Sequence, residues 1–204
     1  MTDPLQEHYQ ALFRTHGNSA HAVQYSDSES QHRRFEILAQ AAGDIGSVVD
    51  LGCGLGHFCD FLRARGFSGK YLGLDFVREF VDDANARHAG DPLVEFRQFD
   101  LRADAYPEGF DTYVVCGVFN NRTPDNQAFL ESTLARAFAA TRRRVAFNLM
   151  STYVDFQDES LFYTDPRAVF DFCKRRLTSR LTLRNDYLVR DDRPPFEYAV
   201  YLYK

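Results

Sequence analysis

The residues with the clearest chemical meaning are three glycines, Gly52, Gly54 and Gly56, in the segment VVDLGCGLGHF. They follow a run of apolar residues, and Asp50 stands two residues ahead of the first glycine. Glycine adopts backbone angles that side chains forbid, and it lets the main chain approach a ligand closely at the N-terminus of a helix. The segment therefore predicts a strand, a turn that holds a ligand, and the start of a helix.

Two more acids end later apolar runs, Asp75 in YLGLDF and Asp100 in FRQFD. At the carboxyl edge of a parallel sheet, a carboxylate such as that of Asp75 can accept hydrogen bonds from both hydroxyls of a ribose. We expect Asp100 to face an adenine amino group, with Leu101 following it. A dinucleotide fingerprint would need a glycine where His57 stands, so the pattern disfavours NAD.

These residues need a sheet to position them. From residue 48 onward, short apolar runs alternate with segments of helical period, which is the pattern of an α/β fold with parallel strands. The first 46 residues carry no strand signal and predict a helical arm, with a capping box of Ser28 and Gln31 at the start of its second helix. Helices are also predicted where Thr123 and Asp165 precede prolines. The expected strands are 47–51, 70–75, 94–99, 112–116, 144–149, 180–187 and 197–203.

Composition limits the classes of function. The chain has 204 residues, 45% of them hydrophobic, and a net charge of -5, so it offers no basic field to a nucleic acid. It has no apolar stretch of about twenty residues and no signal-like start, so we expect a cytoplasmic protein with no membrane partner. The four cysteines form no C-x-x-C pair, which disfavours disulfides and a metal site. The oligomeric state stays open.

Together, the glycine turn and the three acids resemble those of the class I S-adenosylmethionine-dependent methyltransferases. The resemblance runs from about residue 28 to the end. It implies a Rossmann-like, seven-stranded, mostly parallel sheet with helices on both faces, an antiparallel last strand, and S-adenosylmethionine as cofactor. The amino acid part of the cofactor would lie on Asp50 and the glycine turn, its ribose on Asp75, and its adenine on Asp100. The tail, FNLMSTYVD and then DPRAVFDFC, is similar to that of uncharacterised bacterial members and names no substrate.

In this family the end of the fourth strand lies beside the reacting methyl group. Here that strand ends at Cys116, which we count with the cofactor-binding residues. Methyl transfer is an in-line displacement at an activated carbon, so the protein mainly aligns the nucleophile and excludes water. The candidates on the acceptor side follow the fourth and fifth strands: Asn120, Asn121, Tyr153, Asp155 and Tyr163.

The domain expectation is a methyltransferase domain at 47–204 acting on a small-molecule acceptor, preceded by an arm at 1–46 that serves either as a lid or as padding on the sheet. Two alternatives stay open. In one, the aminocarboxypropyl group of the cofactor is attacked and methylthioadenosine is released. In the other, the protein binds S-adenosylmethionine without catalysis.

Overall fold

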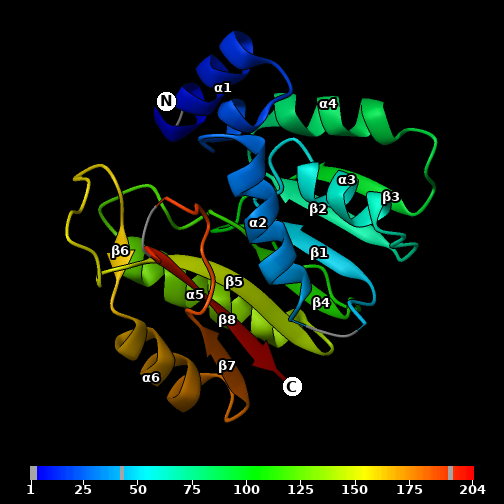
Figure 1. Ribbon diagram of the computed structural model, residues 1–204. Coiled ribbons are helices and arrows are strands. Elements are labelled where there is room, and N and C mark those ends of the chain that lie inside the picture. The colour runs from blue at the N-terminus through cyan, green and yellow to red at the C-terminus, as the bar shows by residue number, and fades with distance from the viewer. Residues whose placement is uncertain (1–3, 42–43, 193–194) are drawn as a thin grey trace.

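One β-sheet organises the molecule, and a computed structural model describes it through residues 4–41, 44–192 and 195–204 (Figure 1). Within these residues the strands are β1 (Val48–Leu51), β2 (Tyr71–Asp75), β3 (Val94–Gln98), β4 (Thr112–Val115), β5 (Arg144–Ser151), β6 (Tyr163–Thr164), β7 (Leu181–Arg184) and β8 (Glu197–Tyr203). Their order is β3-β2-β1-β4-β5-β8-β7, with β6 paired to β5. Each of the seven predicted strands is present within a few residues of its expected bounds, and β6 was not predicted.

The direction of the strands confirms the predicted Rossmann-like fold. The pairs from β3 to β5 are parallel, as is β5 with β6, whereas the last strand, β8, runs antiparallel to both β5 and β7. Strand order reverses at β1, which has β2 on one side and β4 on the other. In open α/β sheets, ligands bind outside the carboxyl ends of the strands at such a reversal. The fold thus places a binding crevice at the end of β1.

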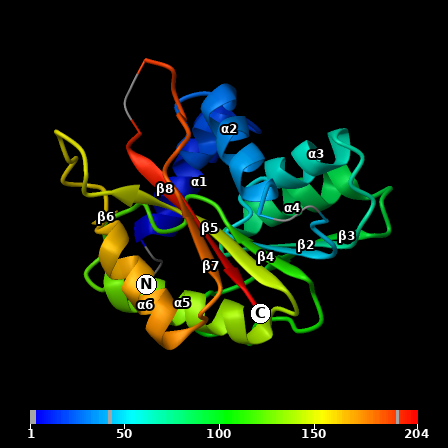
Figure 2. The same ribbon diagram turned by 60° about the horizontal axis from the view of Figure 1, so that its bottom comes forward.

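Helices cover both faces of the sheet (Figure 2). Those in the described residues are α1 (Pro4–His16), the short 3-10 helix η1 (Ala20–Val23), α2 (Ser28–Ala39), α3 (His57–Ala64), α4 (Arg78–His88), α5 (Asn126–Ala140) and α6 (Pro166–Arg176). Side chains of α2, α3 and α4 share one buried cluster with the sheet, and those of α5 and α6 share the other. Because both faces are covered, β1, β2 and β4 are buried along their whole length, and their sequences, VVDL, YLGLD and TYVV, are mostly apolar.

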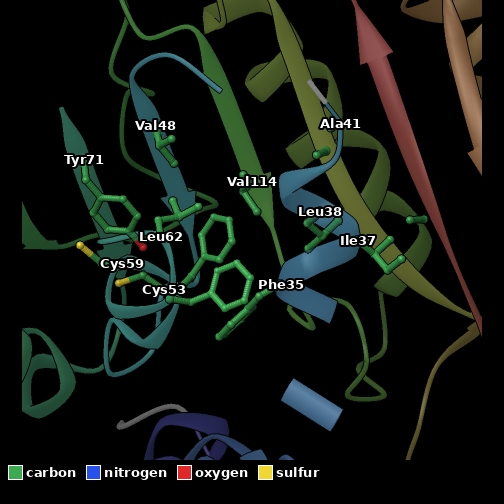
Figure 3. Packing of buried hydrophobic residues seen from close by; sticks show 14 of the residues in the cluster. Phe35, Ile37, Leu38, Ala41, Val48, Cys53, Cys59, Leu62, Tyr71 and Val114 are labelled. Carbon is green, nitrogen blue, oxygen red and sulfur yellow. The ribbon is translucent and has the colours of Figure 1, made fainter. Parts of the chain in front are cut away.

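Figure 3 shows how the arm joins this core. Phe35 and Leu38 of α2 point toward Val48 of β1 and Val114 of β4, and all four are buried. Burial of one large aliphatic or aromatic side chain stabilises a fold by about 1.5–3 kcal/mol. α2 is therefore part of the sheet's packing, whereas α1 and η1 contact the rest of the protein in a smaller cluster around Phe80.

Two predicted helix starts were wrong, and one was confirmed. α2 is capped by Asp27, whose Oδ1 accepts from the N–H of Ser30 at 2.6 Å, and not by Ser28 with Gln31. α5 begins at Asn126, with Asp125 at its N-cap, rather than beside Thr123, whose N–H donates to Oδ1 of Asn126 at 2.6 Å. The third start is confirmed, since the side chain of Asp165 accepts from the N–H of Arg167. Within the described residues, no helix has the length and apolarity to cross a membrane.

Candidate active site

A cavity of about 790 Å³ opens at the carboxyl ends of β1, β2 and β4. Its wall comes from four parts of the chain: the arm, the ends of these strands, the loop between β5 and β6, and the segment before β8. Natural ligand sites have volumes of roughly 300–1,000 Å³. The cavity therefore lies where the strand order predicts a binding crevice and has the size of one.

The predicted glycine turn forms the inner wall. Gly52, Gly54 and Gly56 all have positive φ angles, of 69°, 53° and 77°. A Cβ on Gly52 would lie 2.3 Å from Cγ2 of Val118, and one on Gly54 would lie 2.9 Å from Cγ1 of Val23. Gly52 and Gly54 line the cavity, whereas Gly56 caps α3 and packs on the ring of Phe96 outside the lining. Only glycine satisfies both the angles and the space at this turn.

Asp75 ties the end of β2 to the glycine turn. Its Oδ2 accepts from the N–H of Gly54 at 2.8 Å, and its Oδ1 accepts from the N–H of Val77 at 2.9 Å. Burial raises the pKa of Asp75 to about 6, against the lowering effect of these backbone donors. The carboxylate lines the cavity, where its remaining lone pairs can accept hydrogen bonds from hydroxyl groups of a ligand.

Asp50 also lines the cavity, from β1. The hydroxyl of Tyr71 donates to its Oδ2 at 2.5 Å. Burial raises the pKa of Asp50 to about 7, although this hydrogen bond lowers it and the charge of Asp75 adds to the rise. Two buried carboxylates beside one turn favour a ligand that carries positive charge or hydrogen-bond donors.

The predicted adenine contacts lie elsewhere. Asp100 is exposed and outside the cavity wall; its Oδ1 accepts from the N–H of Arg102 at 2.7 Å, so it closes a local turn after β3. Leu101 packs at the edge of the core beneath α5. The residue of this region that does line the cavity is Phe76, directly after Asp75.

The arm supplies a second wall opposite the glycine turn. The hydroxyl of Tyr25 lies 3.2 Å from the thiol of Cys116, the residue that follows β4. Burial raises the pKa of Cys116 to about 12 and raises that of Tyr25 well above its usual range, so both groups keep their protons. The guanidinium of Arg34 lies 5.2 Å from the Tyr25 ring centre and forms a buried ion pair of 2.8 Å with Glu197.

Both predicted asparagines line the cavity. Nδ2 of Asn121 donates to the hydroxyl of Tyr9 at 2.9 Å and to Oε1 of Gln24 at 3.0 Å, so it fastens the arm to the end of β4. Oδ1 of Asn120 is buried and has no hydrogen-bond partner among the described residues. Since an unpaired buried carbonyl oxygen is costly, this amide is suited to receive a hydrogen bond from a ligand.

The other three predicted residues lie in the loop between β5 and β6 or, in the case of Tyr163, at the start of β6. Asp155 and Tyr163 line the cavity, but Tyr153 is 62% exposed and lies outside its wall, with its ring 5.9 Å from the guanidinium of Arg167. Phe156, which was not predicted, lines the cavity although it is 79% exposed. The structure thus brings two of these three candidates to the site.

The sequence predicted the arm as a lid or as padding but not which of its residues line the cavity, above all Tyr9, Tyr25 and Arg34. These residues occur in no recognisable motif, and their partners lie far along the chain: Cys116 is 91 positions from Tyr25, and Glu197 is 163 positions from Arg34. The only available signal was that an amphipathic arm precedes the first strand. These residues reach the cavity only through the packing of the arm on the rest of the protein.

Comparisons with known proteins agree with this geometry. A family described as "Methyltransferase domain" matches residues 48–143. The Mycobacterium tuberculosis protein named "Putative methyltransferase Rv1506c" is 38% identical over 152 residues, covering 72% of this chain and 89% of that protein. The Saccharomyces cerevisiae protein-lysine N-methyltransferase EFM4 is 32% identical over 93 residues, covering 42% of this chain and 41% of that protein.

Two solved structures share the fold. The magnesium protoporphyrin IX methyltransferase ChlM from Synechocystis PCC 6803, with bound SAH, has a TM-score of 0.68 at 13% identity, covering 97% of this chain and 93% of its own. The DhpI–SAH complex has a TM-score of 0.63 at 23% identity, and the match covers 97% of this chain and 94% of the DhpI chain. At this identity the likeness establishes the arrangement of the strands and helices.

Proposed function

Because the chain belongs to the class I S-adenosylmethionine-dependent methyltransferases, we propose that it transfers the methyl group to a small molecule by in-line displacement. S-adenosylmethionine is the cofactor of this family, and when bound it supplies a methyl group activated by a positively charged sulfur. The observation that carries the small-molecule proposal is the cavity of about 790 Å³, whose wall includes both Asp75 and Asp155. A cavity of that volume has room for the cofactor and one compact acceptor.

The residues of the inner wall fit the cofactor. We assign its ribose to Asp75, whose two backbone hydrogen bonds fix the carboxylate at the end of β2. We assign the amino acid part of the cofactor to Asp50, Gly52 and Gly54, because the glycines leave space for a ligand against the main chain. These residues, with Phe76, form what we call the cofactor half of the cavity.

Arg34 extends this assignment. It is 9% exposed and lines the cavity, and its Nε and Nη1 are taken by Glu197 and by the carbonyl of Ser30. A buried cation in the wall of the same cavity is suited to a carboxylate, so we assign to it the carboxylate of the cofactor. We assign no part of the cofactor to Asp100 or Leu101, because neither lines the cavity.

Asn120, Asn121, Asp155 and Tyr163 form what we call the acceptor half. In-line displacement requires that the nucleophile be aligned with the methyl group and that water be kept out. Cys116 and Tyr25 lie between the two halves as neutral groups. We therefore assign alignment to the acceptor half, and no residue there needs to act as a nucleophile.

Within the arm at 1–46, α2 packs on the sheet, and we further propose that the part before α2 acts as a lid over the domain at 47–204. Val23 lies against Gly54, and the hydroxyl of Tyr25 lies 2.9 Å from where a Cβ on Gly117 would be, so one short segment touches both turns of the cavity. His57, at the start of α3, is 2.6 Å from Oδ1 of Asn18 and 3.1 Å from Nε2 of Gln31. Burial lowers the pKa of His57, so its ring stays neutral in these contacts.

The experiment that tests this function uses S-adenosylmethionine with an isotopically labelled methyl group. The protein is incubated with the small-molecule fraction and, separately, with the protein fraction of a cell extract, and label and cofactor products are followed by mass spectrometry. Label in the small-molecule fraction together with S-adenosylhomocysteine is the expected result. Label confined to protein would refute the small-molecule acceptor, and methylthioadenosine as the product would refute methyl transfer.

A further inference from the structure

The cations in the cavity wall are already paired. Among the described lining residues, Arg34 and Arg190 are the arginines, and no lysine lines the wall. Nε of Arg34 lies 2.8 Å from Glu197, and Nε of Arg190 lies 3.1 Å from Asp192. An anionic acceptor would have to compete with these carboxylates and with the cofactor's own, so the wall disfavours a negatively charged acceptor.

The two acids that the loop between β5 and β6 contributes to the cavity wall have no ion pair among the described residues. Asp155 lines the cavity and has no ion pair or hydrogen bond within the part of the chain that the structure describes. Asp158 also lines it, and the hydroxyl and N–H of Ser160 donate to its Oδ1 at 2.6 and 2.8 Å, which holds its pKa below the usual value. Both side chains are exposed at the mouth, so the acceptor meets a negative rim.

Aromatic side chains accompany these acids. Phe156 stands between them in sequence, and Tyr163 lines the cavity with its hydroxyl 3.2 Å from the N–H of Asp158. A phenylalanine that is 79% exposed leaves apolar surface for a ligand to cover. The faces of aromatic rings attract cations, by about 0.5–1 kcal/mol at exposed sites.

The inner end of the acceptor half holds a hydrogen-bond acceptor and no strong base. Oδ1 of Asn120 has no partner among the described residues, whereas Cys116 and Tyr25 keep their protons. The ring nitrogens of His57, the one described histidine in the wall, are both taken by Asn18 and Gln31. A hydroxyl acceptor needs a base during transfer, but an amine needs only to lose its proton to solvent beforehand.

Resting on the proposed function above, we propose that the acceptor is an amine, attracted to the mouth by Asp155 and the rings of Phe156 and Tyr163, which donates an N–H to Asn120 at the inner end once it is bound. The bound ammonium loses one proton to water. The nitrogen lone pair then forms a bond to the methyl carbon as the carbon–sulfur bond breaks, and that electron pair stays on sulfur. The products are S-adenosylhomocysteine and the methylated ammonium, so charge and atoms balance.

The test compares three probes that share one frame and differ in one group: phenethylamine, phenethyl alcohol and hydrocinnamate. Each is titrated calorimetrically into the protein loaded with S-adenosylhomocysteine. We expect phenethylamine to bind about tenfold or more tightly than either other probe, a preference of about 1.4 kcal/mol. Equal binding of the three, preference for hydrocinnamate or the alcohol, or no binding of phenethylamine would overturn the proposal.

Two variants assign the preference to the cavity wall. Asp155→Asn is expected to reduce the affinity for phenethylamine about fivefold or more while leaving that for phenethyl alcohol unchanged, as loss of a charge–charge contact requires. Glu159→Gln removes a negative charge from the same loop, at a residue that does not line the cavity. It is expected to change neither the affinity for phenethylamine nor that for phenethyl alcohol. Equal losses in both variants would refute the role of Asp155. Loading with S-adenosylhomocysteine is measured first; if loading itself fails, the proposed function fails and not this inference alone.

Discussion

The cofactor half of the cavity is held largely by nearby backbone, with Arg34 of α2 as the exception, whereas the side chains of the acceptor half are held by distant parts of the chain. In the cofactor half, Asp75 is held by two backbone N–H groups and the glycines by their own φ angles. In the acceptor half, Asn121 is held by Tyr9, 112 positions away, and Asp155 by no described side chain. Apart from Arg34, the residues assigned to the cofactor are fixed by local chain geometry, while binding of the acceptor depends on how the arm packs and how one loop lies.

The largest effect is expected from Gly52→Ala. A left-handed backbone costs a non-glycine residue about 1–2 kcal/mol, and the new Cβ would meet Val118 at 2.3 Å, where overpacking costs a further 1–3 kcal/mol or so. We expect the affinity for S-adenosylmethionine, measured by calorimetry, to fall about 100-fold or more.

Gly66→Ala is the matched control for that variant. Gly66 has a φ of 84°, but a Cβ added there would meet no atom within 4 Å, and the residue lies outside the cavity wall. It should lose stability from backbone strain alone and retain its affinity for the cofactor. If both variants lost affinity equally, the close approach at Gly52 would not be what shapes the cofactor half.

The next largest effect on the affinity for S-adenosylmethionine is expected from Asp75→Ala. It removes the hydrogen-bond acceptor assigned to the ribose, and loss of a buried partner costs about 1–3 kcal/mol. The expected loss of affinity for S-adenosylmethionine is therefore about 10- to 100-fold in the same titration. Asp91→Ala serves as a comparison, because Asp91 also accepts a backbone N–H, from Leu93, but lies away from the cavity. Unchanged affinity in Asp75→Ala would remove the ribose assignment.

The same contrast explains which residues the sequence could predict. The glycine turn, Asp75 and the cap at Asp165 were predicted because each makes its contacts with residues close in sequence or on the neighbouring strand. The ion pair of Arg34 with Glu197 could not be predicted, because it forms only when α2 packs across β5 and β8. Tyr153 and Asp155 stand two residues apart in an irregular loop with no periodicity, so nothing in the sequence says which of them turns into the cavity.

A smaller effect, on stability, is expected from Asp50→Asn. The folded-state pKa of about 7 lies above the ordinary value of 3.8, so ionised Asp50 destabilises the fold. The penalty starts as the pH rises above the ordinary value and is complete above the folded one. Without cofactor, we expect Asp50→Asn to raise the Tm at about pH 8 by roughly 2–4 °C, the change that 1 kcal/mol gives in a chain of this size, and to leave it unchanged near pH 4.

Asp111→Asn should change the Tm in the direction opposite to that of Asp50→Asn. The N–H and hydroxyl of Ser47 donate to Asp111 and hold its pKa below the usual value, so its ionised form stabilises the fold, and that stability is lost as the pH falls. This variant is expected to lower the Tm at neutral pH. A Tm that moved in the same direction in both variants would contradict the burial of Asp50 as the cause.

The smallest effect tests the arm. Asn121→Ala removes hydrogen bonds to Tyr9 and Gln24, each worth about 0.5–1.5 kcal/mol, at the point where the arm meets the acceptor half. If the arm is a lid, kcat should fall about 3- to 10-fold while the affinity for S-adenosylmethionine changes less than about twofold, because the cofactor half is held by backbone.

Gln10→Ala loosens the arm elsewhere, by removing the hydrogen bond from Gln10 to Glu79, which lies at the surface away from the cavity wall. It should leave kcat unchanged if only the seal over the acceptor matters. Should Asn121→Ala instead weaken cofactor binding as much as turnover, the segment before α2 would belong to both halves, and the division between a local cofactor site and an assembled acceptor site would fail.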